Sequence, residues 1–287
     1  MRRVLSKFIL VLSIGAVISG CGVVNRFTGS SDKEYTKIEP VTAGSKLYDS
    51  KKADDILVKV KAAMDVEAER MTQDEALELE YTKDDETHRV IRYITRKLHD
   101  GNAYISKDIY TTLNDADKEG HVVKYILSDK VTHTKEVIGS KAELSSMDWV
   151  NGVSEAEPSE VVSSELKQIL EKADIDNSEV RVVNKAGEDL YSVNSLMGIE
   201  DVLNIIGLSP EAFGLMRDKI DNYKCTISVY VDMEDYSIAG YDFNLSDFFN
   251  RYYENAEGVE NCDVVLCKFT NAINYSDSYS KISMVKF

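Results

Sequence analysis

The chain has 287 residues, and its 50 acidic residues outnumber its 34 basic ones, so its formal charge is -16. This acidity argues against nucleic acid as a partner, because phosphate binding needs a basic surface. The length allows one large domain or two small ones, and 16 tyrosines against 3 prolines favour strands over disorder.

The first twenty residues have the composition of a secretory signal. Arg2, Arg3 and Lys7 give a positive start, and an apolar run follows from Phe8 to Ile18. About 20 apolar residues are needed to span a bilayer, so this run is too short and has the length of a signal-peptide core. We therefore expect residues 1–20 to be a signal peptide; the alternative is an uncleaved anchor helix.

The signal ends in Ile18-Ser19-Gly20-Cys21, which resembles the lipobox of bacterial lipoproteins. The resemblance implies cleavage before Cys21 and a covalent diacylglycerol on its thiol; no other cofactor is expected. Two acyl chains hold a protein stably at a membrane, so we expect a lipid anchor and a location on the extracytoplasmic face of the cell membrane. Cleavage removes three basic residues and no acidic one, which takes the formal charge from -16 to -19.

Two segments follow the signal before the first strand-like pattern. Residues 21–52 are polar and without clear periodicity, which predicts a flexible tether between the lipid and the folded body. From Ala53 to Met71, apolar residues recur at helical spacing and predict an amphipathic helix. We expect residues 53–287 to form a single folded domain.

Between Leu77 and Ile138, short segments rich in valine, isoleucine, tyrosine and threonine alternate with turn clusters. Asp100-Gly101 between two such segments is typical of a two-residue hairpin turn. The spacing predicts an antiparallel meander of five or six strands. Because both residues of Val90-Ile91 and of Tyr93-Ile94 are apolar, we expect apolar contacts on both faces of the sheet.

The second half of the chain mixes helical and strand-like patterns. Proline suits the first helical turn, and helices are predicted from Pro158, over Ser195–Ile206 and from Ser209. Strands are predicted at Val180–Val183, Asp189–Val193, within the alternating stretch Cys225–Phe249, at Asp263–Thr270 and at Lys281–Phe287. The fold class is therefore α+β, with an antiparallel sheet that carries its helices on one side.

No residue pattern in the sequence points to catalysis or to a metal. There is no G-x-S-x-G, no phosphate-binding glycine loop and no H-E-x-x-H, so neither a nucleophile–base pair nor a zinc site is indicated, and we expect no enzyme. The four histidines fall in the predicted meander and are expected at its surface or rim: His88, His99, His121 and His133.

Three cysteines remain after Cys21, namely Cys225, Cys262 and Cys267. Their spacing matches no familiar zinc pattern, and we expect them to be small, buried apolar residues. The alternative is a disulfide from Cys225 to one of the other two, which an extracytoplasmic location permits.

One hairpin motif resembles a known family. The stretch VYVDMEDYSIAGYDFNLS, Val229 to Ser246, is similar to a hairpin of LolA/LppX-like lipoproteins of Gram-positive bacteria, in which a strand ends in Asp and a polar turn precedes an alternating strand. The resemblance implies a curved half-barrel sheet with helices on its concave side and a hollow that holds lipid-like molecules. It carries over no ligand-contact residue.

These observations predict a non-enzymatic, membrane-anchored binding protein. A concave apolar cavity suits acyl chains, so the expected ligand is a lipid or another apolar molecule, and the residues expected to line the hollow are Tyr93, Tyr125, Tyr241 and Phe243. A filled core at these positions is the alternative. The corresponding second function is a surface interaction or structural lipoprotein that binds another envelope protein and has no ligand cavity.

Overall fold

The computed structural model describes residues 36–38, 45–47, 49–65, 68–83, 85–113, 116–213, 215, 217–255, 262–283 and 285. The expected signal peptide and Cys21 lie outside these ranges. The helices are α2 (Ser50–Asp65), α3 (Pro158–Lys172), α4 (Ile199–Ile205), α5 (Arg217–Ile220), α6 (Ser246–Asn255) and α7 (Asp277–Ser280), with 3-10 turns η1 (Lys141–Ser146), η2 (Ile175–Asn177) and η3 (Pro210–Phe213). The strands are β1 (Thr36–Ile38), β2 (Ser45–Lys46), β3 (Met71–Lys83), β4 (Glu86–His99), β5 (Asn102–Leu113), β6 (Ala116–Ile126), β7 (Val131–Ile138), β8 (Val150–Val153), β9 (Glu179–Lys185), β10 (Glu188–Gly198), β11 (Tyr223–Asp232), β12 (Ile238–Asn244) and β13 (Cys262–Asn274).

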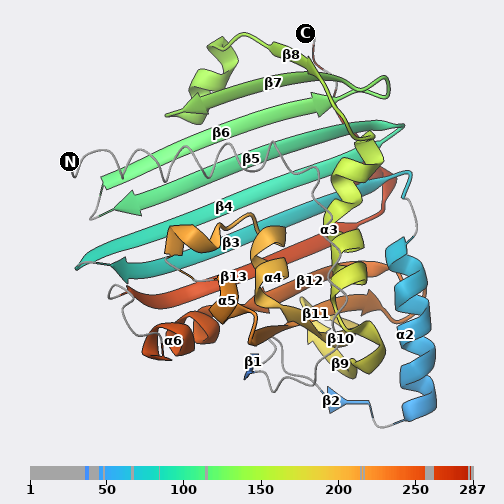
Figure 1. Cartoon of the computed structure of the whole chain (residues 1–287). Helices are drawn as coiled ribbons and strands as arrows, with labels where there is room; N and C mark the ends of the chain where they lie inside the picture. Colours follow the sequence, from blue (N-terminus) through green and yellow to red (C-terminus); the bar gives the residue numbers. More distant parts are fainter. Residues whose placement is uncertain are drawn as a thin grey trace.

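All of these strands belong to one sheet. Their order is β2-β9-β10-β11-β12-β13-β3-β4-β5-β6-β7-β8, and β1 pairs with β11 in parallel. Among the described strands the end strands β2 and β8 do not pair with each other, so the sheet is curved but unclosed (Figure 1). Strand β13, near the end of the chain, pairs with β3 and thereby joins the two strand-rich halves.

The predicted meander is confirmed as the antiparallel strands β3 to β7. Its predicted hairpin turn is also confirmed, because Asp100 and Gly101 have φ angles of 49° and 72° between β4 and β5. Positive φ at both central residues defines the turn whose twist matches that of the flanking strands. The local sequence is thus sufficient to fix the register of this hairpin.

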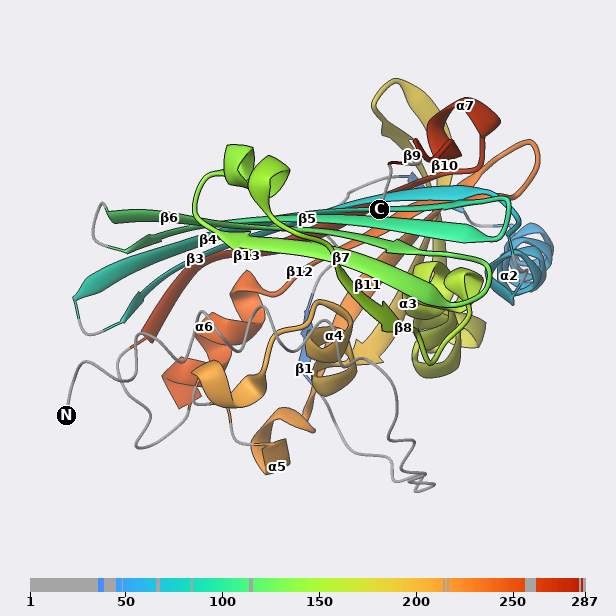
Figure 2. The same ribbon diagram turned by 90° about the horizontal axis from the view of Figure 1, so that it is seen from above.

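The helices lie mainly on one side of the sheet. Figure 2 shows α3, α4, α5 and α6 on the concave side, whereas η1 and α7 lie on the other side. Helix α2 packs against α3 and buries its apolar stripe of Ile56, Val60 and Met64. The α+β fold class, a curved antiparallel sheet with helices on its concave side, is therefore observed as expected.

Several predicted boundaries are wrong because tertiary pairing overrides local pattern. The first helix ends at Asp65 rather than Met71, and Met71 begins β3, where it pairs with Leu98. Residues Ser195 to Gly198 continue β10 along β11, so α4 starts only at Ile199.

Other differences concern the chain ends and one missed helix. Strands β1 and β2 lie inside residues 21–52, so part of the range assigned to the tether belongs to the sheet. The described residues after Ser280 form no strand, contrary to the prediction for Lys281–Phe287. Helix α6 was not expected; its Phe248, Phe249 and Tyr252 are buried on one helical face.

Candidate functional site

A buried polar network fixes α3 to the concave face of the sheet. The Glu165 carboxylate on α3 accepts hydrogen bonds from the Arg96 guanidinium on β4 at 2.7 Å and from the Tyr241 hydroxyl on β12 at 2.6 Å. Arg96 also pairs with Glu75 on β3, and the Asn271 amide on β13 donates to the Tyr241 hydroxyl. Four strands and one helix therefore meet in this network, and the contacts made by Arg96 and Glu165 are charge-assisted hydrogen bonds, which are the strong kind.

The setting of this network is apolar and largely water-free. The side chains of Arg96, Glu75 and Glu165 are each about nine-tenths buried or more. Burial, followed by the Glu165 carboxylate, raises the pKa of Tyr241 well above its usual value, so its hydroxyl remains a proton donor. A charge deprived of its partner in such a place is strongly destabilising, and the network therefore holds α3 in one position.

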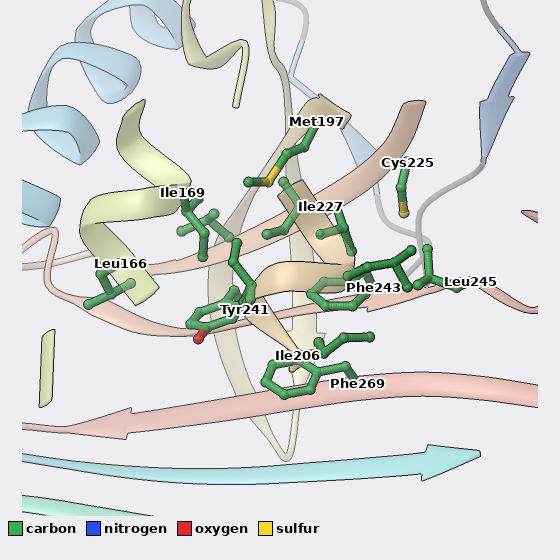
Figure 3. Packing of buried hydrophobic residues seen from close by; sticks show 14 of the residues in the cluster. Leu166, Ile169, Met197, Ile206, Cys225, Ile227, Tyr241, Phe243, Leu245 and Phe269 are labelled. Carbon is green, nitrogen blue, oxygen red and sulfur yellow. The ribbon is translucent and has the colours of Figure 1, made fainter. Parts of the chain in front are cut away.

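The half of the concave face under the helices is a filled core. Tyr241 and Phe243 on β12 are fully buried, and the Phe269 ring on β13 stacks on both, with centroid distances of 5.8 Å and 5.0 Å. Leu166 and Ile169 of α3 lie beside them (Figure 3). Packing of this kind resembles ordinary protein interiors, which have few voids larger than a water molecule.

The four residues predicted to line a hollow lie on two different faces of the sheet. Tyr241 and Phe243 belong to the filled core, whereas Tyr93 and Tyr125 lie on the outward, convex face. Tyr93 is 46% exposed, and the buried Tyr125 donates its hydroxyl to the carbonyl of Ser283. The four side chains do not come together, because neighbouring strand positions point to opposite faces; ligand contact by any of them stays a prediction.

A different part of the concave face exposes apolar side chains. Helix α3 packs on β5 at one end of this part of the sheet (Figure 1). The register from Arg96 places four apolar residues on this side, and we call them the apolar strip: Ile105 on β5, Val122 on β6, Ile138 on β7 and Val150 on β8. The first two are half-buried, whereas Ile138 and Val150 are 59% and 70% exposed. Apolar exposure thus rises toward the β8 edge.

Three cations lie on the same face as the apolar strip. Arg92 pairs in register with Ile109, Lys107 with Val122, and Lys124 on β6 with Ile105. From Arg92 to Lys107 to Lys124, each step crosses to the next strand and moves two residues along it. The three cations therefore form a diagonal line across β4, β5 and β6. Diagonal neighbours on a sheet are about 7–8 Å apart. We call Arg92, Lys107 and Lys124 the cation line.

The environment of the cation line disfavours its charges. Lys107 is 4% exposed, and its burial, together with the nearby Arg92 and Arg96, lowers its pKa to about 7, against the opposing effect of Glu136. Burial also lowers the pKa of Arg92 to about 10 and lowers that of Lys124. These shifts have the direction expected for cations that are removed from water and lie near one another.

One carboxylate, that of Glu136 on β7, lies on the same face as this line, in register with Val122. The acidic residues of β5 and β6 all face outward: Asp108, Asp117 and Glu119. The Arg92 guanidinium donates to the carbonyl of Ile206 after α4 at 2.5 Å. Hence a cationic stripe lies inside a protein whose overall charge is strongly negative, a feature that sequence reasoning missed.

The four histidines do not converge. His88 stacks on Tyr81 with ring centroids 4.6 Å apart, and His133 Nδ1 lies 2.8 Å from the Asn151 side-chain oxygen. The expectation of a surface or rim position is wrong for His121, whose side chain is completely buried, with Nδ1 2.7 Å from Asp108. Its strand position faces η1 rather than solvent, because η1 packs on β6 and β7.

His99 lies near a serine and an acid, but the serine cannot serve as an exposed nucleophile. The Nδ1 atom of His99 is 3.1 Å from Ser280 Oγ, and its Nε2 atom is 3.4 Å from Asp100. Ser280 is fully buried, so a substrate carbonyl has no approach to its hydroxyl. The contact instead attaches α7 to the end of β4.

Cys225 and Cys267 are free thiols, and both are buried, as the sequence predicted. Burial raises the pKa of Cys267 to about 12, and it raises that of Cys225 as well. Within the described ranges, no three or more His, Cys, Asp and Glu side chains gather so that they could hold a metal ion. No described helix has both the length and the apolar character needed to cross a membrane.

Comparison with protein-family models and with curated protein sequences found no match. Among solved structures, the chain is similar to the lipoprotein LppX of Mycobacterium tuberculosis, with 10% identity, a TM-score of 0.34, and coverage of 77% of this chain and 93% of that one. It is also similar to a DUF1329 family protein from Desulfovibrio piger, with 10% identity, a TM-score of 0.20, and coverage of 80% and 96%.

A third similar structure is a domain described as an outer membrane lipoprotein-sorting protein, from Vibrio parahaemolyticus. It has 10% identity and a TM-score of 0.22, and the match covers 80% of this chain and 94% of that one. At these TM-scores the three likenesses decide neither ligand nor site. The functional assignment therefore depends on the residues of this chain.

Proposed function

We propose that this chain is a lipid-anchored, extracytoplasmic binding protein without catalytic activity, and that it holds an apolar ligand against the apolar strip. The single observation that supports this proposal most is the contrast between the two halves of the concave face. The helix-covered half is filled by side chains such as Phe243, whereas Ile138 and Val150 remain exposed on the other half. Ile138 continues the diagonal formed by Ile105 and Val122, and an exposed apolar patch is a common mark of a binding site.

The shape of the strip favours a long, flexible apolar ligand. Ile105, Val122 and Ile138 are successive diagonal neighbours across β5, β6 and β7, and such neighbours are about 7–8 Å apart, so this part of the strip extends for about 15 Å. Val150 lies apart from Ile138, opposite Thr134. An acyl chain can lie along such a surface and bury its methylene groups at about 0.8 kcal/mol each. The resemblance of the Val229–Ser246 hairpin to LolA/LppX-like lipoproteins agrees with a lipid-like ligand.

Photocrosslinking tests this proposal. The full chain in detergent is irradiated with a diacylglycerol that carries a diazirine on one acyl chain, and the adducts are mapped by peptide mass spectrometry. We expect adducts on β5 to β8, reduced in Val122→Gln on the inward face of β6 and retained in the matched variant Val123→Gln on its outward face. Adducts spread equally over both faces of the sheet, or no adduct at all, would contradict ligand binding on the strip.

The proposed anchor has an independent test. In a bacterial host, wild-type protein should carry a diacylglycerol adduct on Cys21 and fractionate with the membrane. Cys21→Ala should remain uncleaved and unlipidated. A wild-type protein that keeps residues 1–20 and carries no lipid adduct would show that the apolar run acts as an uncleaved anchor.

A second candidate function has its own supporting observation. The edge strand β8 exposes Val150 and Val153, the latter at 78%, and an exposed strand edge is a template for pairing with another chain. A surface interaction lipoprotein that binds an envelope protein would use this edge. Without lipid adducts, a self-association or partner complex that Val153→Lys abolishes in sedimentation experiments would favour this function.

A further inference from the structure

We propose that His121 is a proton-operated latch that holds the segment from η1 to β8 on the convex face of the sheet. The imidazolium closes the latch, and the neutral ring loosens it. The segment runs from Lys141 to Val153 and includes the edge strand β8. The latch goes beyond the proposed function, because it acts on this segment whether or not the apolar strip holds a ligand.

His121 lies between two carboxylates and is buried from water. Its side chain is completely buried, its Nδ1 atom is 2.7 Å from the Asp108 carboxylate on β5, and its Nε2 atom is 3.4 Å from the Glu119 carboxylate on its own strand. Val137 of β7 lies opposite His121 in register, and η1 packs on β6 and β7. The ring is thus enclosed by β5, β7 and η1.

Only the protonated ring can donate to both carboxylates. Burial opposes the ionisation of Asp108, but hydrogen bonds from Lys141 and His121 outweigh it and lower the pKa of Asp108. The ionised carboxylate can only accept, so Nδ1 of His121 carries a proton. In the neutral ring Nε2 is then an acceptor, and this buried atom has no hydrogen-bond partner among the described residues. A second proton turns Nε2 into a donor beside Glu119.

The charged groups around the ring also favour the imidazolium. The titratable side chains that face it from the flanking strands and from η1 are Asp108, Tyr110, Glu119, Lys135, Lys141 and Glu143. Among them, three carboxylates stand against two ammonium groups when the ring is neutral. The imidazolium makes the opposite charges equal in number, and an opposite charge close by favours the charged form of a group.

Two contacts connect the state of the ring to η1. Lys141 on η1 donates to the second oxygen of the Asp108 carboxylate at 2.6 Å, and the Gly139 amide just before η1 donates to the Glu119 carbonyl at 2.9 Å. Both residues that hold η1 are therefore the ones that His121 contacts. A donor at Nε2 fixes Glu119 beside Asp108, whereas its loss leaves a buried acceptor unsatisfied, which is costly, and so loosens the attachment of η1.

Trp149 provides a readout of this segment, because it is the only tryptophan of the chain and directly precedes β8. Its ring is 5.7 Å from the Tyr125 ring, and the Lys135 ammonium lies over it at 4.8 Å. Acrylamide quenching of tryptophan fluorescence is measured on the full chain in detergent from pH 8 to pH 5.5. We expect quenching to fall with acid in a single step, as the loosened population decreases about tenfold, the effect of one buried hydrogen bond.

Matched variants assign the change to His121. His121→Asn keeps a donor for Asp108 but takes up no proton, so its quenching should not change with pH. His133→Asn, on the same face and next to β8, should behave as wild type does. Glu119→Gln should move the step to lower pH, because it removes a charge that attracts the second proton.

Three results would refute the latch: a wild type whose quenching does not change with pH, a step that persists in His121→Asn, or a step that disappears in His133→Asn. If His121→Asn is misfolded by circular dichroism, Glu119→Gln decides instead, and a step at an unaltered pH in that variant overturns the proposal.

Discussion

Replacing Arg96 with methionine should be the most damaging single change on the concave face. The variant removes the cation that contacts both buried carboxylates, Glu75 and Glu165. Glu165 then keeps the hydrogen bond from the Tyr241 hydroxyl and the charge of Arg92. Breaking a buried ion pair from one side costs about 3–5 kcal/mol. Domains unfold with about 5–15 kcal/mol, so the loss should remove a large share of the total stability.

Urea unfolding followed by circular dichroism measures this loss. Arg89→Met removes the same charge from an exposed position of the same strand, and it should change the unfolding free energy by less than about 0.5 kcal/mol. Arg96→Met/Glu165→Gln should recover part of the loss, because it deletes one of the two carboxylates that have lost the Arg96 charge. If Arg96→Met costs less than about 1 kcal/mol, the network contributes no more than a surface ion pair and does not anchor α3.

Three further predictions concern the backbone, the cation line and the thiols. Gly240→Ala should lower the free energy of unfolding, measured in urea, by about 3 kcal/mol, because Gly240 has a φ of +151° and an added Cβ would lie 2.2 Å from a carbonyl oxygen of β13. The control is Gly187→Ala: Gly187 has a φ of +91°, but an added Cβ would meet no atom within 4 Å. This variant should cost only about 1 kcal/mol. Burial lowers the pKa of Lys107 from 10.5 to about 7, so between these pH values the unfolded chain binds more protons than the folded protein. The free energy of unfolding should therefore rise with pH across that window. Lys107→Met should flatten this rise and be more stable than wild type at pH 7. Cys225 and Cys267 should resist iodoacetamide at pH 8 in the folded protein and react after unfolding, as peptide mass spectrometry can check.

Local patterns predicted those elements whose stability is itself local. The Asp100-Gly101 turn needs positive φ at two successive residues, and both residue types tolerate it. Pro158 begins α3 because proline fits the first helical turn. By contrast, Ser195 to Gly198 looks helical in isolation, yet these residues are in β10 because β11 provides their hydrogen-bond partners.

The faces of the strands were harder to predict, because both faces of β4 and β6 carry apolar residues. The pair Tyr93 and Ile94 gives no indication of which side chain points inward. The turn η1 packs on the outward side of β6 and β7. No local sequence signal predicts that contact. Charges would have been more informative than aromatics: Arg92 and Arg96 alternate with Ile94. Their role depends on the non-local contacts of α3 and α4, which periodicity does not contain.

Two kinds of buried cation share the concave face, and their difference has a functional meaning. Arg96 is balanced by the carboxylates of β3 and α3, so its charge contributes to the position of a helix. Lys107 has a pKa near 7, which means that the folded protein resists its charge. A face optimised for stability alone would carry apolar residues there, as it does at Ile94 and Ile109, and natural proteins depart from such consistency chiefly at functional sites.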